Sequence, residues 1–475
     1  MDSSHRKERA EARTRRLGEA NLRRVMFTLS VPAILGMLSN ALYHVVDSIY
    51  IGRLGTQAIG AISVAFPIFA LIGAVGISFG VGTASFISRA LGAGRKREAD
   101  RASAAGFVSV VVVGLSLSAF GLVFLDPVLR VFGATDTILP FARDYGVIMI
   151  AGSTVTMLKI YFNNLVRAEG NTRWSMIGMM SGAFLNIILD PILIFSVGLG
   201  IRGAAIATVI SQGVALVLLA GHFVIRHSYV RFRPWDFRVP ATVYRDMLGT
   251  GSPMFFRQAM GSFAIALLNN AAAAYGDPAV ASVGIVLRVL VFGMMPVYGF
   301  GQGYQPVAGY NYGAGSFGRL FHAMRLSIVW TAIYTSALTA VALVFTPYIA
   351  GLFSTDSEVI AIGTFGLRMV YSVFPLFGFQ VVALVSFQAL GKPLPALFIG
   401  LARQGIFLVP AVFLLDSWFG LAGVLASQGV ADLLTALCSI ALGAGLVRTL
   451  RGEARVAAAG EPTGDAVVQP VGLAE

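Results

Sequence analysis

GTQAIGA at Gly55–Ala61 and GDPAVAS at Gly276–Ser282 lie about 221 residues apart and share their order of glycine and apolar positions. Other stretches repeat at the same spacing: FGVG at Phe79–Gly82 with FGQG at Phe300–Gly303, GAG at Gly92–Gly94 with GAG at Gly313–Gly315, and Gly170 in RAEGNTR with Gly391 in QALGKPL. In two further matches, Pro127 with Pro347 and Gly203 with Gly423, the spacing is shorter by one residue. Because the register hardly slips, we predict one helical unit that is present twice in the chain.

The composition is that of a membrane protein. Hydrophobic residues make up 56% of the chain and charged residues 12%, the mean hydropathy is +0.78, and apolar runs are long enough to cross a hydrocarbon core of about 30 Å. We therefore predict an all-α integral membrane protein in the lipid bilayer, with twelve transmembrane helices in two six-helix lobes. The predicted spans are residues 25–51, 56–88, 102–125, 139–165, 174–197, 203–225, 247–275, 279–309, 322–346, 358–388, 394–416 and 421–446.

These spans divide the chain into five parts: a basic tail at residues 1–24, an N-lobe at 25–225, a linker at 226–246, a C-lobe at 247–447 and a tail at 448–475. The linker carries five arginines, two prolines and Trp235, and we expect it to lie at the membrane surface. The end of the last part is rich in Ala, Gly, Glu and Pro and lacks an apolar period, which predicts a disordered tail. Internal duplication of hydrophobic segments is typical of secondary transporters, whose substrate path runs between the halves.

The distribution of basic residues predicts the orientation in the membrane. We count a residue within about four positions of a span end with the adjoining connection. Of 35 Lys and Arg, 26 then fall in the N-terminal tail, the even-numbered connections and the C-terminal part, while the odd-numbered connections hold only Arg53, Arg130, Arg143 and Arg202. Lys and Arg accumulate in cytoplasmic loops near the ends of spans. We therefore expect a multi-pass protein of the cell membrane with both termini in the cytoplasm. The net charge of +12 then reflects the basic residues of the cytoplasmic loops, and nucleic acid is not an expected partner.

Several classes of protein are disfavoured by what the sequence lacks. No GxxxxGK[ST] phosphate-binding loop occurs, which argues against transport driven by ATP hydrolysis in this chain and favours an ion gradient. Cys438 is the single cysteine, which rules out an intramolecular disulfide and any cysteine-based metal cluster. No cleavable signal is evident, and we expect the first span to be retained as a signal anchor.

Carboxylates inside spans are few here and therefore informative, because each costs about 2.5–3.5 kcal/mol at the centre of a span on insertion scales. Asp47 lies in the first span and Asp190 in the fifth, where Asn186 precedes it by four residues on the same helical face. Pro191 follows directly and frees a backbone carbonyl for a kink or a ligand. Two interpretations stay open: proton exchange at a buried carboxylate, or a structural or water-exposed carboxylate near the external end of its span.

Five segments of the chain form a recognisable set: VVDSIYIGRLG at Val45–Gly55, RALGAGR at Arg89–Arg95, RAEGNTRWSM at Arg167–Met176, LNIILDPILI at Leu185–Ile194 and GFGQGYQPVAGYNYGAG at Gly299–Gly315. Together they resemble the multidrug and toxic compound extrusion (MATE) transporters, and most closely their prokaryotic DinF-like branch. The likeness covers roughly residues 20–447, and the last two segments are quite specific when found together. The resemblance implies a two-lobed antiporter with a central cavity, in which the N-lobe binds the coupling cation.

In that branch the cation site is formed by an Asp in the first span, a Tyr in the fourth, an Asn and an Asp in the fifth, and a Thr in the sixth. The resemblance places these roles on Asp47, Tyr145, Asn186, Asp190 and Thr208. A proton is one candidate for the coupling ion. Na⁺, held by the two aspartates and the asparagine, is the other.

Two more N-lobe residues stand out by comparison with the branch. Pro32 resembles the proline at which the first helix of the branch can bend, and the alternative is a passive kink. His44 stands where the branch commonly has Asn, three residues before Asp47 on the same face of the helix. It is a candidate modulator of coupling, because an unperturbed His titrates near about 6.5. The alternative is a neutral His that is hydrogen-bonded within the bundle.

The C-lobe lacks the acidic residues that another MATE branch carries in its seventh and eighth spans, and this chain has Arg257, Gln258 and Arg288 there. We therefore expect no coupling cation in this lobe. The arginines either contact an anionic part of a substrate or pair with carbonyls and the partner lobe. Gln302 and Gln305 lie beside close-packing glycines, which favours a role in packing and hinge motion, with substrate contact as the second interpretation.

These features indicate a secondary active antiporter. We expect it to export drugs or amphipathic, mostly cationic small molecules in exchange for H⁺ or Na⁺ by alternating access. A flippase for a lipid-linked precursor, a function found in the same wider superfamily, is the alternative. An enzyme is not expected, since no cluster of polar catalytic groups converges at one interface. We also expect a monomer with no cofactor and no metal other than Na⁺ as the alternative coupling ion.

Overall fold

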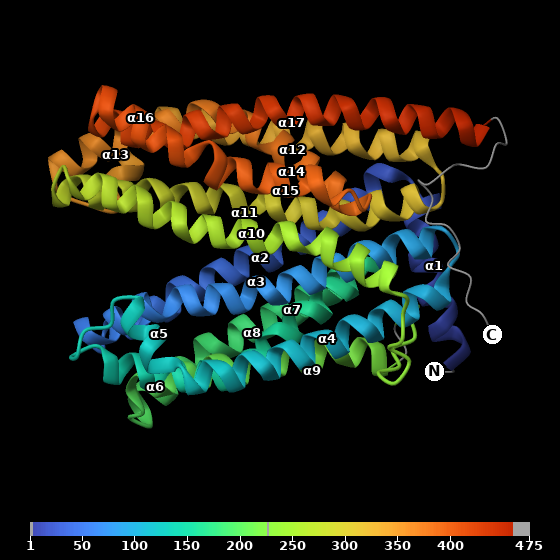
Figure 1. Cartoon of the computed structure of the whole chain (residues 1–475), viewed down its shortest axis with the longest axis horizontal. Coiled ribbons are helices and arrows are strands. Elements are labelled where there is room, and N and C mark those ends of the chain that lie inside the picture. Colours follow the sequence, from blue (N-terminus) through green and yellow to red (C-terminus); the bar gives the residue numbers. More distant parts are fainter. Residues whose placement is uncertain (1–2, 226–227, 459–475) are drawn as a thin grey trace.

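The computed structural model describes residues 3–225 and 228–458, and every regular element of these residues is helical. In Figure 1 the helices form two bundles, one from each half of the chain. The first half contains α1 (Ser3–Glu19), α2 (Leu22–Gly52), α3 (Thr56–Gly92), α4 (Lys96–Val123), α5 (Leu125–Val131), α6 (Leu139–Ala151), α7 (Ser153–Ala168), α8 (Thr172–Pro191), the π-helical turn η1 (Ile192–Ser196) and α9 (Gly200–Val224). The second half contains α10 (Ala241–Ala273), α11 (Asp277–Gly313), α12 (Phe317–Gly351), α13 (Ser357–Val373), η2 (Phe374–Leu376), α14 (Phe377–Ala389), α15 (Pro393–Leu401), η3 (Ala402–Ile406), α16 (Leu408–Phe419) and α17 (Leu421–Ala458).

Each half crosses the membrane six times. Within the described chain, ten helical segments are long and apolar enough to be spans, and three of them are composite: α8 with η1, α13 with α14, and α15 with α16. The eleventh is α6 with α7, which are bent by 50° about Gly152. The twelfth is α10, which is 33 residues long but less apolar because it carries Arg245, Asp246 and Arg257. The prediction of twelve spans in two six-helix lobes is confirmed.

The sequence repeat extends to the backbone conformation. Aligned glycines adopt the same left-handed conformation in both halves, with φ of +107° at Gly55 and +90° at Gly276, and +73° at Gly94 and +66° at Gly315. Glycine adopts these angles without steric cost. The first pair immediately precedes α3 and α11, the long helices that face each other between the lobes.

Each lobe has a core of its own. Met157 and Tyr161 are fully buried in the N-lobe, while Tyr304, Phe374 and Phe377 are buried in the C-lobe. The rings of the two phenylalanines stack with their centroids 5.4 Å apart. Because lipid tails are as apolar as these side chains, close packing and hydrogen bonds hold the helices together in a membrane.

The lobes meet mainly through four helices, with α3 packed on α10 and α2 packed on α11. The closest approaches are reciprocal. A Cβ atom on Gly92 would lie 2.0 Å from the carbonyl oxygen of Tyr310, and one on Gly313 would lie 2.0 Å from the carbonyl oxygen of Arg89. The two glycines are aligned by the sequence repeat and so are the two carbonyl residues, so each half makes the same contact with the other. No side chain fits at either point without separating the helices.

We call the end of the molecule where α3 and α11 end the closed end. There the guanidinium of Arg89 in α3 donates to both carboxylate oxygens of Asp246 in α10, at 3.0 and 2.9 Å. Farther along the interface, the amide nitrogen of Gln302 donates to the sulfur of Met37 at 3.2 Å. From there the two lobes diverge toward the opposite end, which we call the open end (Figure 1).

The closed end is also bridged by α1, a segment whose sequence predicts only a basic tail. Leu17 is 2% exposed. Its carbonyl oxygen accepts a hydrogen bond from the amide of Asn311 at 3.0 Å and from the guanidinium of Arg319 at 3.3 Å, both in the C-lobe. Its side chain packs beside Gly170 of the N-lobe. The helix therefore contacts both lobes.

The linker is tied to the N-lobe over its described residues. The carboxylate of Glu169 accepts hydrogen bonds from the hydroxyl of Ser228 and from the backbone N–H of Val230, the latter at 2.8 Å. The backbone N–H of Arg231 donates to the carboxylate of Asp100 at 2.7 Å. Burial raises the pKa of Asp100, although the neighbouring Lys96 and Arg231 oppose this shift.

The C-terminal boundary differs from the sequence prediction. The helix α17 continues without a break through residues 448–458, so these residues are helical where the sequence predicts a disordered tail. Its last turns carry Glu453, whose carboxylate lies 3.5 Å from the ammonium group of Lys392. The rest of the predicted tail, residues 459–475, lies outside the described residues.

Candidate functional site

Three of the five predicted cation-site residues form one hydrogen-bonded group inside the N-lobe. The amide nitrogen of Asn186 donates to Oδ1 of Asp190 at 3.0 Å and to the hydroxyl oxygen of Thr208 at 3.4 Å. The first two residues lie one helical turn apart on α8, and the third faces them from α9. Asp190 is 0% exposed, so this carboxylate is shut off from bulk solvent.

Asp47 completes the group from α2. Its carboxyl group lies within hydrogen-bonding distance of the carboxyl group of Asp190. Oδ1 of Asp47, Oδ2 of Asp190 and Oδ1 of Asn186 are buried, and none of them receives a hydrogen bond from the described residues. Buried oxygens of this kind need a donor or a cation. The arrangement can therefore hold a proton or one small cation between the two carboxylates.

The local sequence explains how Asp190 is held. Pro191 has no N–H to donate to the preceding turn, and the helix widens into the π-helical turn η1 directly after it. Gly203 at the start of α9 lets that helix approach closely, because a Cβ there would lie 2.6 Å from the carbonyl oxygen of Leu193. The close contact brings Thr208 to Asn186, the partner of Asp190.

Two tyrosines lie near the two carboxylates. Tyr145, the fifth predicted residue, is 6% exposed and packs edge-on against Phe69 with the ring centroids 5.5 Å apart. It lies within electrostatic range of both carboxylates, and so does Tyr43, which the sequence reasoning did not select. Tyr43 precedes Asp47 by four residues on α2, so the spacing that singled out His44 could also have identified Tyr43.

The structure places His44 and Pro32 as follows. His44 is exposed, its ring is tilted by 33° against the ring of Tyr43 with the centroids 4.0 Å apart, and it makes no side-chain hydrogen bond within the described residues. The structure shows no hydrogen-bond partner for this ring among the described residues, and both interpretations of His44 stay predictions. Pro32 is buried, and α2 runs through it as one continuous helix. Lys159 of α7, another intramembrane charge, lies within electrostatic range of His44.

In the C-lobe, Arg257 is stacked on an aromatic ring. Its guanidinium carbon lies 5.2 Å from the ring centroid of Tyr298, and one of its N–H groups donates to the tyrosine hydroxyl at 3.4 Å. Arg288 is exposed, and Gln258 is half-buried beside Arg257 in sequence. The structure thus gives Arg257 a partner on α11 within its own lobe, which is neither a backbone carbonyl nor the N-lobe. The roles of both arginines stay predictions.

A buried ion pair in the C-lobe was missed by the sequence reasoning. The guanidinium of Arg403 donates to both carboxylate oxygens of Asp432 at 2.6 and 3.2 Å and lies 4.9 Å from the ring centroid of Phe377. Gln380 and Gln428 also donate to Asp432, at 2.6 Å to its carbonyl and 3.0 Å to its carboxylate. Asp432 is a carboxylate inside the last predicted span, so its position in the sequence was enough to select it as a candidate buried charge.

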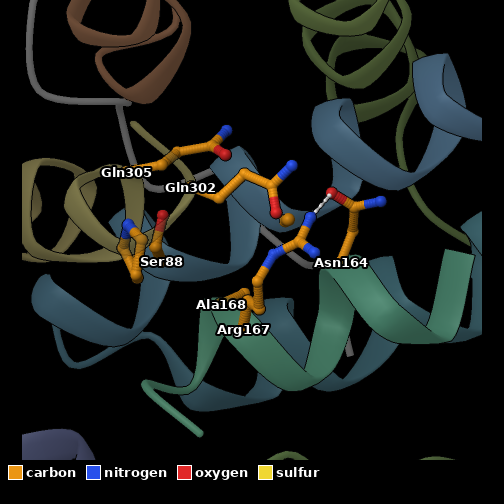
Figure 2. Close-up of a pocket in the computed structure, with 8 residues that line it drawn as sticks. Ser88, Asn164, Arg167, Ala168, Gln302 and Gln305 are labelled. Atoms are coloured by element: carbon orange, nitrogen blue, oxygen red, sulfur yellow. Dashed lines mark hydrogen bonds between the residues drawn. The ribbon is translucent and has the colours of Figure 1, made fainter. Parts of the chain in front are cut away.

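Gln302 and Gln305 lie at the interface of the lobes. They project from α11 toward a small cavity that α3 and α7 complete, opposite Arg167 (Figure 2). Oε1 of Gln302 and Nε2 of Gln305 are buried and have no hydrogen-bond partner among the described residues. This placement between closely packed helices agrees with the predicted role in packing.

No group of three or more His, Cys, Asp or Glu side chains in the described part of the chain could hold a metal ion. The donors around Asp190 are two carboxylates, an amide and a hydroxyl. Oxygen donors of this kind suit a proton or a hard monovalent cation.

Comparison with known sequences identifies the family. A family model described as MatE matches residues 32–192 and again residues 253–414. The starts of the two matches keep the spacing of the sequence repeat, so the model recognises each half separately. Multidrug export protein MepA of Staphylococcus haemolyticus is 30% identical over 423 residues, which cover 89% of this chain and 93% of that protein. MepA of Staphylococcus aureus is 29% identical over 418 residues, which cover 88% and 92%.

Solved structures agree with this relationship. A transporter of the MOP superfamily from Pyrococcus furiosus, described as having a binding pocket of reverse polarity, superposes with a TM-score of 0.87 at 27% identity and covers 92% of this chain and 98% of that chain. A multidrug resistance MATE family transporter in an outward-facing conformation gives the same values. A MATE transporter in a bent conformation has a TM-score of 0.88 at 26% identity, covering 94% and 99%. The chain therefore belongs to the MatE family of membrane transporters and is not an enzyme.

Proposed function

We propose that this transporter exports amphipathic, mostly cationic small molecules, including drugs, in exchange for H⁺ or Na⁺. The observation that carries the proposal is the contact between the carboxyl groups of Asp47 and Asp190 inside the N-lobe. Two ionised carboxylates in contact repel each other, so the pair is stable only when a proton or a cation is shared between them. Loading and unloading of that ion then changes the packing of α2 against α8.

The substrate class is supported by the relatives and by the charges of the N-lobe. The two staphylococcal proteins are multidrug export proteins by name. A carboxylate pair attracts organic cations when it is ionised, and the adaptable Phe and Met side chains of this chain suit varied amphipathic ligands. The coupling ion and the substrate then compete for the same negative charge.

The proposed orientation makes the structure an outward-facing state. Basic residues concentrate at the ends of helices on the side of the termini, so that side faces the cytoplasm. The closed end is then cytoplasmic, and the open end faces outward. The likeness to a relative in an outward-facing conformation supports this assignment. The protein would act in the cell membrane as a monomer, because one chain supplies both lobes.

Alternating access follows from these elements. In the outward-facing state an ion enters the site of Asp47 and Asp190 and displaces the bound compound. The lobes then rock, so that the closed end opens and the ion leaves to the cytoplasm. Coupling requires that ion and compound favour opposite states, because a ligand with equal affinity for both states shifts no equilibrium.

The test is efflux of a fluorescent organic cation from proteoliposomes under an imposed pH gradient or an imposed Na⁺ gradient. We expect transport under one of these gradients, and we expect Asp190→Asn to fold but to lose it. Asp136→Asn is the matched control, because the Asp136 side chain is 87% exposed in a surface ion pair. Gradient-driven transport that persists in Asp190→Asn would remove this carboxylate from the mechanism. No movement under either gradient would instead favour a flippase, with lipid-linked substrates as the next test.

A further inference from the structure

The small cavity between the lobes contains a buried positive charge that the proposed transport cycle does not use. Arg167 at the end of α7 is 6% exposed, and its one side-chain hydrogen bond goes to the amide oxygen of Asn164 at 2.6 Å. No carboxylate of the described residues lies within ion-pairing distance of its guanidinium. The nearest in sequence, Glu169, is engaged by His222, Ser228 and the backbone of Val230.

A buried charge without a counter-ion is costly, and native proteins compensate it. The other two arginines that are buried in the described part of the chain have carboxylate partners: Arg89 pairs with Asp246, and Arg403 with Asp432. Arg167 instead faces a space that holds about one water-sized particle (Figure 2). The space is too small for a substrate or a lipid headgroup.

The other polar groups of the cavity can complete an anion site. The amide Nε2 of Gln305 is a buried donor without a partner among the described residues, and its side chain is 8% exposed. The amide nitrogen of Gln302 is engaged only by the sulfur of Met37, a weak acceptor, so a flip that exchanges the amide oxygen and nitrogen would present a second donor. The hydroxyl of Ser88 already donates to the carbonyl of Ser85 at 3.0 Å.

We propose that this cavity binds one monoatomic anion, chloride in a living cell, between Arg167 of the N-lobe and Gln305 of the C-lobe. Chloride needs N–H donors and a positive charge, and the side chains of Gln305 and Arg167 supply both at this cavity. Because the donors come from both lobes, the complete site exists only when the closed end is closed. Bound chloride therefore stabilises the state in which the closed end is closed. This part of the proposal rests on the rocking motion of the proposed function.

The location of the anion is tested with crystals of the full-length protein grown in bromide. We expect an anomalous bromide peak within hydrogen-bonding distance of the guanidinium of Arg167 and the amide of Gln305. A cavity that contains only water, with no bromide, overturns the proposal. This measurement needs no transport, so its result does not depend on whether the proposed function is correct.

The effect on conformation is tested with spin labels on Arg97→Cys and Gly318→Cys in a Cys438→Ala background. Both sites are exposed, and they lie on opposite lobes at the closed end. Replacing gluconate by chloride should raise the population with the shorter distance. Arg167→Gln and Gln305→Leu should each raise the half-saturating chloride concentration about tenfold or more. Arg173→Gln, which removes an exposed charge nearby, should leave it unchanged.

A distance distribution that is the same in chloride and gluconate would overturn the role of the anion in closure. The two substitutions act on different lobes, so the proposal stays testable if one variant fails to fold. An equal chloride response in wild type and in Gln305→Leu would also contradict it, because that variant keeps the positive charge but loses the donor of the C-lobe.

Discussion

The ion pair of Arg403 and Asp432 shows what a single buried charge requires in this protein. We expect Asp432→Leu to destabilise the C-lobe by about 3–5 kcal/mol, because it leaves the guanidinium buried without its partner. The measurement is the fraction of protein that stays monodisperse in detergent after heating. The double variant Arg403→Leu/Asp432→Leu should recover most of the loss, since two apolar residues need no pairing. Equal losses in the single and double variants would show that packing rather than charge is affected.

His44 is the residue at which the chain departs from the branch that it resembles. The residue is exposed, its ring lies tilted against that of Tyr43, and it makes no side-chain hydrogen bond with the described residues. We therefore expect His44→Asn to leave the midpoint of the pH dependence of efflux unchanged. The measurement is initial efflux rate against pH in proteoliposomes, with Asp190→Asn as the variant that loses gradient-driven efflux. A midpoint that moves in His44→Asn would make this histidine part of the coupling.

Much of the candidate site was predictable from residues alone. An Asp inside a span is rare, and the spacing of Asn186 and Asp190 already puts both on one face of a helix. The contact between Asp190 and Asp47 was not predictable from spacing, because it depends on how α2 packs on α8. Asp432 was overlooked although its signal was the same, and its role as partner of Arg403 again depends on packing between distant segments.

The helices α3 and α11 set how tightly the closed end closes. Gly92→Ala or Gly313→Ala would place a methyl group 2.0 Å from a carbonyl oxygen of the other lobe. We expect each to push the lobes apart at a cost of about 1–3 kcal/mol. The readout is the alkylation rate of Ser88→Cys, a buried position at the closed end, in a Cys438→Ala background. The rate should rise by about tenfold or more if the closed state loses that energy.

Matched controls lie on the same two helices. Gly73 of α3 and Gly284 of α11 have no atom within 4 Å of an added Cβ. Gly73→Ala and Gly284→Ala should leave the alkylation rate unchanged. If all four variants react at the rate of the parent protein, the glycine contacts do not control closure.

Element boundaries show where sequence reasoning reaches its limit. The twelve spans were predictable because each is a long apolar run. The break between α6 and α7 at Gly152 was not predictable, because it depends on the packing of α9 against this glycine. The docked helix α1 was read as a tail, since its composition is polar and its contacts are with Asn311 and Arg319 on the other half of the chain.

The orientation of the protein in the membrane can be tested by labelling single cysteines from outside the cell. We expect Thr135→Cys, in the exposed loop between α5 and α6, to react with a membrane-impermeant maleimide on intact cells. Arg97→Cys, exposed at the closed end, should react only after the cells are opened, because basic residues mark the cytoplasmic side. Both variants carry Cys438→Ala. The reverse pattern would invert the assignment of the structure as outward-facing.

The duplication was visible in the sequence, and the position of the two halves relative to each other was not. Six spans in each half dictate that both halves run in the same direction through the membrane. Which helices meet is decided by surfaces that the glycine pattern only partly marks, such as the ion pair between Arg89 and Asp246.

The reciprocal contacts of Gly92 with Tyr310 and of Gly313 with Arg89 have an evolutionary consequence. Contacts in which each partner presents the same patch to the other are those of a homodimer with twofold symmetry. The lobe interface thus has the form of a dimer interface between two copies of an ancestral six-helix protein, later joined into one gene. Two halves of one gene can change separately, and the lobes now differ: the N-lobe holds the aspartate pair, and the C-lobe holds the ion pair of Arg403 and Asp432.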